Sequence, residues 1–329
     1  MVMENGKILE VKDLAVSYKV YEGILKVLRN VSFYVLKGEK IGIIGESGCG
    51  KTTSMKSIMR ILPTNALLEG GEIYYKGKNI LKISKKEMTY LRRHSISMIF
   101  QDPSTALNPV FKIGPQIYDI VKYSSDRRLT KSEIHELAIS YLKQAALPEP
   151  ERILDSYPFQ LSGGMKQRVN IAMSLASAND LLIADEPGTS LDVTIEDQIM
   201  RLLKSIVEEK HLSIILISHA LGTVRGFVDR IYVMYAGTIV EYGPTKSIFS
   251  NPLHPYTRLL IESVPKLMGK KIPEGIPGVV PSYLNPPLGC RFSTRCPFKM
   301  DICEREMPQV YEAEDGHFVA CHLFRKEGS

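Results

Sequence analysis

The sequence predicts an α/β protein whose core is a mostly parallel β-sheet, with a helical subdomain and a small cysteine-containing domain at the C-terminus. Short apolar runs such as those at 40–44, 180–186 and 213–219 are typical of buried strands. Helix-like segments separate these runs, and this alternation favours parallel strands covered by helices. Beyond Phe249 the chain becomes rich in proline and carries four cysteines near its end. A second, smaller domain is therefore expected there.

The N-terminal part is predicted to consist of strands that lead into a glycine-rich loop. Apolar residues recur in segments 8–18 and 30–35, and the apolar run at 40–44 ends directly before the loop. A helix over 51–62 is expected to end at Pro63, because proline cannot continue a helix. Further strands are predicted at 71–77 and 95–101, on either side of a basic helical segment over 84–94.

A helical subdomain is predicted over residues 102–165. Thr130 and Glu133 have the spacing of a capping box, in which each side chain hydrogen-bonds the backbone of the other residue. The apolar residues that follow recur on one face of a helix. A second helix is expected to begin near 161–164 and to run through 165–178.

The rest of the first domain is predicted to alternate between strands and helices. A helix over 192–210 separates the two buried strands already named, and segment 230–243 reads as a hairpin that turns at Ala236-Gly237. We place a domain boundary near Ser250. Residues 1–250 then form the first domain and residues 251–329 the second.

Charge and composition argue against several classes of protein. The net charge of +6 comes from 42 Lys and Arg against 36 Asp and Glu, and the basic residues are scattered rather than gathered in a tract with interleaved aromatics. Nucleic acid is therefore not expected as a partner. The sequence has no secretory signal pattern at its start and no run of about 18 apolar residues. A cytoplasmic protein is expected, and a reducing compartment argues against disulfides.

Residues 45–53, GESGCGKTT, carry the first chemical motif. The pattern Gly-x-x-x-x-Gly-Lys-Thr follows a predicted strand and precedes a predicted helix, as in phosphate-binding P-loops. Backbone N–H groups at such a helix start point one way and suit an anion. The lysine offsets charge on the β- and γ-phosphates, and the threonine hydroxyl after it ligates Mg²⁺. The predicted nucleotide-binding residues of this loop are Gly45, Ser47, Gly48, Gly50, Lys51, Thr52 and Thr53.

Two further motifs carry acidic residues and a second glycine loop. Asp185 and Glu186 end a buried strand, where one acid can hold the water shell of Mg²⁺ and the other can activate an attacking water. The segment LSGG at 161–164 opens a helix and predicts a second anion site, with Ser162, Gly163 and Gly164 as its contacts. One nucleotide cannot easily use both loops of one chain. Two chains facing head to tail would let each LSGG close over the nucleotide of the other.

In this order the motifs resemble those of the ATP-binding cassette (ABC) ATPases, a group of P-loop NTPases. The resemblance implies that 45–53 is Walker A, that 161–165 is the signature loop and that 190–192 is the D-loop. It implies Asp185 as the Walker B residue and Glu186 as the catalytic carboxylate. It also implies an adenine-stacking role for Tyr18, with Tyr21 as a competitor, an Mg²⁺ and partner-sensing role for Gln101, and γ-phosphate contact by His219; Lys51, Glu186 and His219 are the expected catalytic residues.

Three positions depart from the usual pattern of this family. Gly188 stands where relatives usually have threonine, and Ala220 stands where an aspartate is common. Neither replaces a group expected to touch phosphate, so we expect hydrolysis to be intact. Cys49 takes a position often held by serine and is interpreted as a small loop residue.

The C-terminal part resembles the extension of oligopeptide and dipeptide import ATPases, which are close to the nickel importers. The resemblance rests on NPLHPYTRLLIESVP at 251–265 and GCRFSTRCPF at 289–298. It implies an ATPase at the cytoplasmic face of the membrane, paired with a second, similar ATPase and two transmembrane permease subunits, and served by an extracytoplasmic peptide-binding protein. Dipeptides, longer peptides and nickel stay open as substrates. A non-transport ABC ATPase acting on nucleic acid is the alternative from another class.

The four late cysteines, Cys290, Cys296, Cys303 and Cys321, predict a metal site more than disulfides. Their spacing has neither the tight pairs typical of zinc nor a ferredoxin run, so it leaves zinc and iron-sulfur open. The resemblance to peptide importers implies a [4Fe-4S] cluster, whose role we interpret as structural. We expect loss of Cys296 to loosen the extension and to leave nucleotide binding in place.

Overall fold

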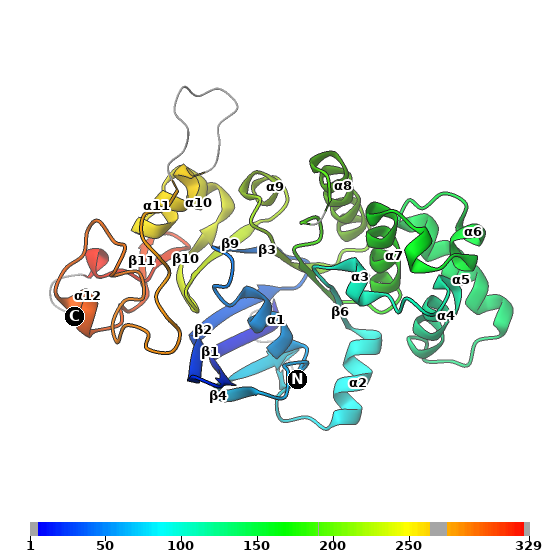
Figure 1. Ribbon diagram of the computed structural model, residues 1–329, viewed down its shortest axis with the longest axis horizontal. Helices are drawn as coiled ribbons and strands as arrows, with labels where there is room; N and C mark the ends of the chain where they lie inside the picture. Colours follow the sequence, from blue (N-terminus) through cyan, green and yellow to red (C-terminus); the bar gives the residue numbers. More distant parts are fainter. Residues whose placement is uncertain (1–5, 190, 264–274, 326–329) are drawn as a thin grey trace. The chain divides into compact units, whose positions relative to one another are not determined.

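The computed structural model describes residues 6–189, 191–263 and 275–325 (Figure 1). The chain divides into two compact units, of which the first comprises Met1–Val35, Lys40–Leu81 and Ser218–Ser329 and the second Leu36–Glu39 and Lys82–Ile217. The predicted C-terminal domain after Ser250 thus lies in the same unit as the N-terminal strands. Ser190 of the predicted D-loop and the end of the 251–265 motif lie outside the described residues.

In the first unit, one sheet has the strand order β2-β1-β4-β5. β1 runs antiparallel to β4, with Leu9 opposite Tyr75 and Tyr18 opposite Ala66. Alternating apolar residues such as Leu9 and Val11 are buried, as period-two patterns predict. The strands are β1 (Lys7–Val20), β2 (Gly23–Leu36), β4 (Ala66–Tyr75) and β5 (Lys78–Asn79).

The other strands of the first unit follow the order β3-β9-β10-β12-β11. β3 is parallel to β9, and β9 turns into β10 at Ala236 and Gly237, whose φ angles of 42° and 81° match the predicted hairpin turn. β12 then pairs antiparallel with β10, with Val319 opposite Glu241. The C-terminal strands therefore continue the sheet of the strand that leads into residues 45–53. The bounds are β3 (Lys40–Ile44), β9 (Arg230–Tyr235), β10 (Thr238–Pro244), β11 (Tyr311–Glu314) and β12 (His317–Val319).

The first helix, α1, covers Lys51–Ile58 and is shorter than the predicted 51–62. It ends because Arg60 adopts a left-handed conformation with φ of 51°, and the Ile61 N–H then donates to the Lys56 carbonyl. Such a left-handed residue closes a helix before any proline is reached. The remaining helices of the unit are α9 (Leu221–Arg225), α10 (Thr245–Ser250), α11 (Pro255–Glu262), α12 (Ile302–Arg305) and the 3-10 helix η3 (His322–Phe324).

The second unit contains the parallel strands β8, β7 and β6, which are buried throughout, as continuous apolar runs predict. The predicted capping box of Thr130 with Glu133 begins α5, and a further capping box, of Ser84 with Glu87, begins α2. Helices dominate from α3 to α7, which confirms the predicted helical texture. The bounds are α2 (Lys85–His94), β6 (Ile96–Ile99), α3 (Pro103–Ala106), α4 (Ile113–Tyr123), α5 (Lys131–Gln144), α6 (Pro150–Asp155), η2 (Pro158–Gln160), α7 (Gly163–Leu175), β7 (Leu181–Asp185), α8 (Val193–Glu209) and β8 (Ser213–Ile217).

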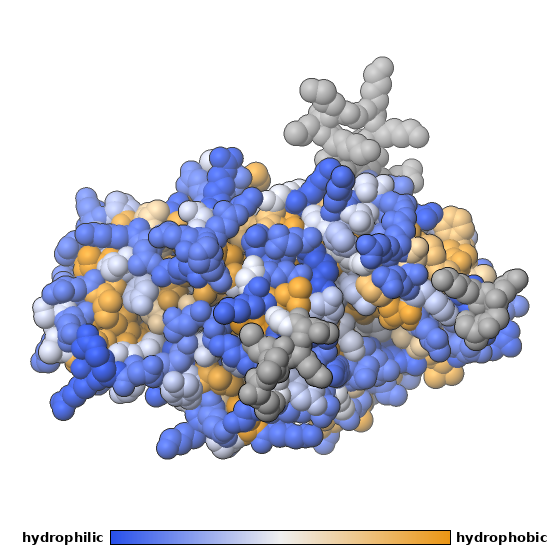
Figure 2. All heavy atoms as spheres, turned by 180° about the vertical axis from the view of Figure 1, so that it is seen from behind, coloured by the Kyte–Doolittle hydropathy of each residue, from blue (hydrophilic) through white to orange (hydrophobic). Residues whose placement is uncertain are grey.

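Hydrophilic side chains cover much of the face shown in Figure 2, with hydrophobic ones dispersed among them. Within the described ranges, every helix is too short or too polar to cross a bilayer.

Candidate active site

Residues 45–53, the phosphate loop, connect the end of β3 to the start of α1 in the first unit. Gly45 is required by crowding, because a Cβ there would lie 2.0 Å from the Met234 carbonyl oxygen. Gly48 is required by its backbone, whose φ of 75° is rarely adopted by other residues. The predicted strand, glycine loop and helix are therefore in place, which is the arrangement that presents backbone N–H groups to phosphate.

Lys51 begins α1 and lies over the loop. Its ammonium group donates to the carbonyl oxygens of Gly45 at 2.8 Å and Glu46 at 3.0 Å. The side chain is buried, so its charge acts in a site with little water. Burial raises the pKa of the neighbouring Cys49 thiol, and this effect outweighs the lowering by Lys51. Cys49 thus remains a neutral thiol, in agreement with its interpretation as a small loop residue.

The structure distinguishes between the two tyrosines considered for adenine stacking. The Tyr18 hydroxyl lies 3.2 Å from the Thr53 hydroxyl in the first turn of α1, so this ring is next to the phosphate loop. Tyr21 is fully exposed in the turn between β1 and β2. Thr52 and Thr53 are half-buried, whereas Ser47 and Gly48 are exposed. Placement at the loop favours Tyr18 over Tyr21 for the predicted role, which stays a prediction.

The predicted acids lie in the second unit, at the end of β7. Asp185 is buried as the last residue of the strand. Glu186 follows with a left-handed φ of 48°, and its N–H donates to the Ile217 carbonyl at 2.9 Å. Its carboxylate accepts a hydrogen bond from the Gln101 amide at 2.9 Å. Gln101 and Glu186, which are 85 residues apart in sequence, are therefore brought together as predicted for one site.

Two residues that sequence analysis did not single out support this acid. The Thr189 hydroxyl donates to the Glu186 carboxylate at 3.1 Å. The buried Gln167 side chain donates to the Pro187 carbonyl at 2.6 Å and so fixes the loop after the acid. The sequence contained a signal for Gln167, because it lies one helical turn beyond the LSGG segment and α7 begins there. No pattern in the sequence indicated Thr189.

The LSGG segment begins α7, as predicted. Ser162 is the N-cap, and its hydroxyl accepts from the Met165 N–H at 3.3 Å. Ser162 and Gly163 are exposed, while a Cβ at Gly164 would lie 2.9 Å from the Ile195 side chain. Ser162 and Gly163, at the start of this helix, thus lie at the surface.

The predicted site residues fall into two groups according to the compact units. The phosphate loop, Tyr18 and His219 belong to the first unit, and His219 is exposed directly after β8. Gln101, the acids and the signature loop belong to the second unit. The hydrogen bond between Gln101 and Glu186 joins two predicted site residues within the second unit. The contact between the Tyr18 and Thr53 hydroxyl groups joins two within the first unit.

The phosphate loop also receives side chains from the C-terminal segment, the described residues 251–263 and 275–325. These side chains are Tyr256, Tyr283 and Arg295, and each contacts Glu46 or Gly48 of the loop. Motif analysis treated the segment as a separate domain and missed all three residues. The tyrosine of NPLHPYT and the arginine of FSTRC belong to the motifs quoted for the extension, but no spacing rule connects them to a P-loop.

The four late cysteines gather in the C-terminal segment. All are free thiols, and the Cys290 N–H donates to the Cys303 carbonyl at 2.8 Å. Burial, with smaller contributions from the other three thiols, raises the pKa of Cys290 to about 12. Burial likewise raises the pKa of Cys321 to about 11. In the part of the chain that the structure describes, no group of three or more His, Cys, Asp or Glu side chains is arranged to hold a metal ion.

Comparison with known families and proteins gives matches to two family models over separate parts of the chain. Residues 28–189 match the model of the ABC transporter family, and residues 240–303 match that of the oligopeptide/dipeptide transporter C-terminal region. The dipeptide transport ATP-binding protein DppD of Bacillus subtilis is 44% identical over 320 residues, which is 96% of this chain and 95% of that protein. The oligopeptide transport ATP-binding protein OppD of Bacillus subtilis is 42% identical over 324 residues, 98% of this chain and 90% of that protein.

Solved structures show the same core. The ATP-binding cassette MJ0796, in a dimeric post-hydrolysis state bound to ADP and phosphate, superposes with a TM-score of 0.65 at 29% identity. The superposition covers 72% of this chain and 98% of the MJ0796 chain. The likeness to relatives extends over almost all of the sequence, so this chain belongs to the ABC transporter family and, within it, to the ATP-binding proteins that carry the oligopeptide/dipeptide transporter C-terminal region.

Proposed function

We propose that this ABC ATPase powers the import of dipeptides or longer peptides across the cytoplasmic membrane, as a peripheral subunit at its cytoplasmic face. The single observation that carries the proposal is the similarity, over nearly the full chain, to ATP-binding proteins named for dipeptide and oligopeptide transport. The match of residues 240–303 to the peptide-transporter C-terminal region supports it independently of the ATPase core. The proposed partners are a second ATPase, two permease subunits and a peptide-binding protein.

The proposed mechanism assigns one task to each group of residues. The N–H groups of the phosphate loop and the Lys51 ammonium bind the β- and γ-phosphates, and the Tyr18 ring stacks on adenine. The Glu186 carboxylate, oriented by Gln101 and Thr189, accepts a proton from the water that attacks the γ-phosphate in line. His219 of this chain contacts the γ-phosphate, as does the signature loop of the second ATPase, and both stabilise its developing charge.

The chemistry of the side chains supports Mg²⁺ as the proposed ion, because Thr52, Gln101 and Asp185 offer hydroxyl, amide and carboxylate oxygens, the donors that it prefers. Thr52 and Gln101 would hold it, with Asp185 acting on its water shell. When bound, the ion supplies neutralisation of phosphate charge.

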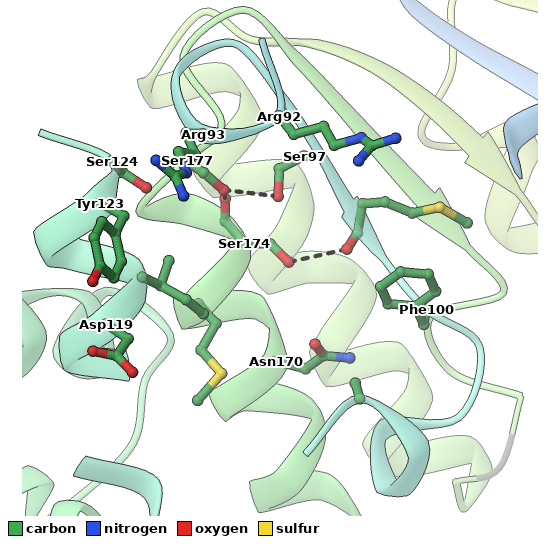
Figure 3. Close-up of a pocket in the computed structure, with 14 residues that line it drawn as sticks. Arg92, Arg93, Ser97, Phe100, Asp119, Tyr123, Ser124, Asn170, Ser174 and Ser177 are labelled. Atoms are coloured by element: carbon green, nitrogen blue, oxygen red, sulfur yellow. Dashed lines mark hydrogen bonds between the residues drawn. The ribbon is translucent and has the colours of Figure 1, made fainter. Parts of the chain in front are cut away.

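A cavity of about 380 Å³ in the second unit is the proposed docking site for a permease subunit (Figure 3). It lies beside Phe100, the residue before Gln101, so a segment seated there would act on the residue that holds Glu186. The Arg93 guanidinium lies 4.9 Å from the centre of the Tyr123 ring at its edge. The Asn170 amide is buried in its wall and has no hydrogen-bond acceptor for Nδ2 among the described residues.

The function is tested by reconstituting the chain with its second ATPase and permeases in vesicles and measuring ATP turnover. We expect turnover to rise when binding protein loaded with a short peptide is added. Stimulation by nickel-loaded binding protein alone would reassign the substrate, and stimulation by DNA alone would overturn the transport assignment.

Replacing Tyr123 with alanine tests the docking cavity in the same vesicles. We expect peptide stimulation to fall more than unstimulated turnover, because the variant alters the cavity edge and not the residues that contact ATP. Leu137→Ala, a change at a comparably exposed apolar residue of α5 outside the cavity, serves as the control and should retain full stimulation. Equal loss of stimulated and unstimulated turnover in Tyr123→Ala would argue against docking there.

The C-terminal thiols are proposed to hold a [4Fe-4S] cluster, with zinc as the competing metal. Among the described residues no three His, Cys, Asp or Glu side chains are arranged to hold a metal ion, so the proposal rests on the four free cysteines of one segment and on the resemblance of the extension. A four-iron cluster is larger and accepts ligands that stand further apart. The fold brings at least two of the cysteines together, because the Cys290 N–H donates to the Cys303 carbonyl at 2.8 Å. When bound, the cluster would supply covalent links between distant parts of the C-terminal segment.

Iron, acid-labile sulfide and zinc contents of protein purified without oxygen test this assignment. We expect stoichiometric iron and sulfide with a broad visible absorption band that is lost on reduction. Stoichiometric zinc without sulfide, or no metal, would remove the cluster and leave the ATPase assignment unchanged.

A further inference from the structure

Three side chains of the C-terminal segment hold the phosphate loop from outside the P-loop motif. The Tyr256 hydroxyl accepts from the Glu46 N–H at 2.9 Å. The Tyr283 hydroxyl donates to the Gly48 carbonyl at 2.8 Å. The Arg295 guanidinium donates twice to the Glu46 carboxylate, at 2.8 and 3.2 Å. All of these residues belong to the first unit. The loop is thus tied at two of its residues to a part of the chain more than 200 positions away.

Tyr256 is fixed by packing and cannot follow a moving loop. It is fully buried in α11, and its ring lies 4.6 Å from that of Tyr235 and 5.5 Å from that of Phe292. Burial raises the pKa of its hydroxyl, so the group stays protonated at neutral pH. The position of its oxygen, and with it that of the Glu46 N–H, is set by this aromatic cluster.

Arg295 is fixed by its other hydrogen bonds. Its side chain is only 3% exposed, against 27% for that of Glu46. Besides the carboxylate, it donates to the Tyr235 hydroxyl and to the carbonyl oxygens of Ile276 and Pro277. Moving the guanidinium away from Glu46 would therefore break these hydrogen bonds as well. A bidentate ion pair of this kind also fixes the direction of the Glu46 carboxylate.

Tyr283 sets the direction of a peptide plane in the loop. Its own backbone is held to the sheet by the Lys26 N–H, which donates to the Tyr283 carbonyl at 2.8 Å. The two sides of a peptide plane point in opposite directions. Holding the Gly48 carbonyl to Tyr283 therefore also fixes the direction of the Cys49 N–H, which donates to the Glu46 carbonyl at 3.3 Å and closes the turn in which Gly48 has a left-handed backbone.

We propose that Tyr256, Tyr283 and Arg295 are positioning residues for ATP, which keep the phosphate loop in its binding shape before the nucleotide arrives. A P-loop binds phosphate through backbone N–H groups that must converge. A loop held in that shape loses less conformational freedom on binding, so its affinity is higher. The proposal rests on the ATPase assignment and is independent of the transported substrate and of the metal at the cysteines.

The test measures ATP binding and turnover in the full-length chain carrying Tyr283→Phe or Arg295→Gln. We expect the dissociation constant and KM for ATP to rise about 3–10-fold for Tyr283→Phe and about 10–100-fold for Arg295→Gln, values that follow from neutral and charged hydrogen bonds. The value of kcat should change little, because neither residue touches the reacting atoms. Tyr311→Phe and Arg305→Gln, elsewhere in the same segment, are the matched controls and should retain the wild-type constants.

Glu46→Gln keeps the test decisive if Arg295→Gln folds poorly, because it should raise the ATP dissociation constant by itself. Glu46→Gln removes the same ion pair from the loop side, so its effect on the ATP dissociation constant should not add to that of Arg295→Gln. Unchanged ATP affinity in Tyr283→Phe and Glu46→Gln, whatever their thermal stability, would overturn the proposal. The contacts would then contribute to stability and not to ATP binding. A wild-type chain that failed to bind ATP would instead overturn the ATPase assignment on which the proposal rests.

Discussion

Replacing Glu186 with glutamine is expected to lower ATP turnover by about 10²–10⁴-fold and to leave ATP binding in place. The amide has the shape of the carboxylate, and its oxygen can still accept from Gln101 and Thr189. It cannot take a proton from water, however, so the step that activates the nucleophile is lost. The measurement is single-turnover ATP hydrolysis beside equilibrium ATP binding, both on the purified chain.

Glu209→Gln is the matched control for this variant. Glu209 is an exposed acid at the last turn of α8 in the same unit, and its replacement makes the same change of charge. Turnover by Glu209→Gln should equal that of the wild type. Near-normal hydrolysis by Glu186→Gln would remove Glu186 from the proton-accepting role, and a loss of ATP binding would show that the substitution disturbs more than the chemistry.

Elements with a strong local pattern were predictable from the sequence. The apolar run at 40–44 became β3, and the capping box at Thr130 and Glu133 begins α5. The hairpin turn at Ala236 and Gly237 was also predicted correctly, because left-handed backbone is signalled by glycine. α1 was predicted too long, because its end depends on a left-handed arginine and not on the proline that follows.

Long-range pairing was not predictable. β11 and β12 are short strands: β12 pairs with β10, about 75 residues earlier in the chain, and β11 pairs in turn with β12. The same limit applies to the site. Motif order predicted the phosphate loop and Glu186, whereas the contacts that Thr189 and Tyr283 make with them follow from no spacing rule. For this reason motif analysis treated the extension and the nucleotide site as independent, and the contacts to Glu46 and Gly48 argue against that view.

Replacing Glu241 with alanine is expected to destabilise the first unit by about 3–5 kcal/mol, because each buried donor left without its acceptor costs about 1–3 kcal/mol. Glu241 is fully buried on β10. Its carboxylate accepts from the Leu253 N–H at 2.9 Å, the His254 N–H at 2.8 Å and the His317 ring at 2.8 Å. Alanine would leave three donors without an acceptor in a place that water does not reach. The midpoint of urea unfolding measures the effect.

Two further variants are compared with Glu241→Ala for their effect on the free energy of unfolding. Glu241→Gln keeps the volume but turns an NH₂ group toward one of the donors, so its loss of stability should be smaller than that of alanine. Glu314→Ala removes an exposed acid that lies 3.8 Å from the other nitrogen of His317, and about 0–1 kcal/mol is expected for such a surface pair. Equal effects of Glu241→Ala and Glu314→Ala would contradict a special role for the buried carboxylate.

The same variant connects stability to the nucleotide site. Leu253 and His254 lead directly into α11, where the Tyr256 hydroxyl holds the Glu46 N–H of the phosphate loop. Loss of the Glu241 carboxylate frees the start of that helix while leaving every P-loop residue unchanged. ATP affinity in Glu241→Ala, measured where the protein is still folded, should therefore fall together with stability, and in Glu314→Ala it should not. A folded Glu241→Ala protein with wild-type ATP affinity would mean that Tyr256 keeps its place without the helix start, so that the aromatic cluster alone positions its hydroxyl.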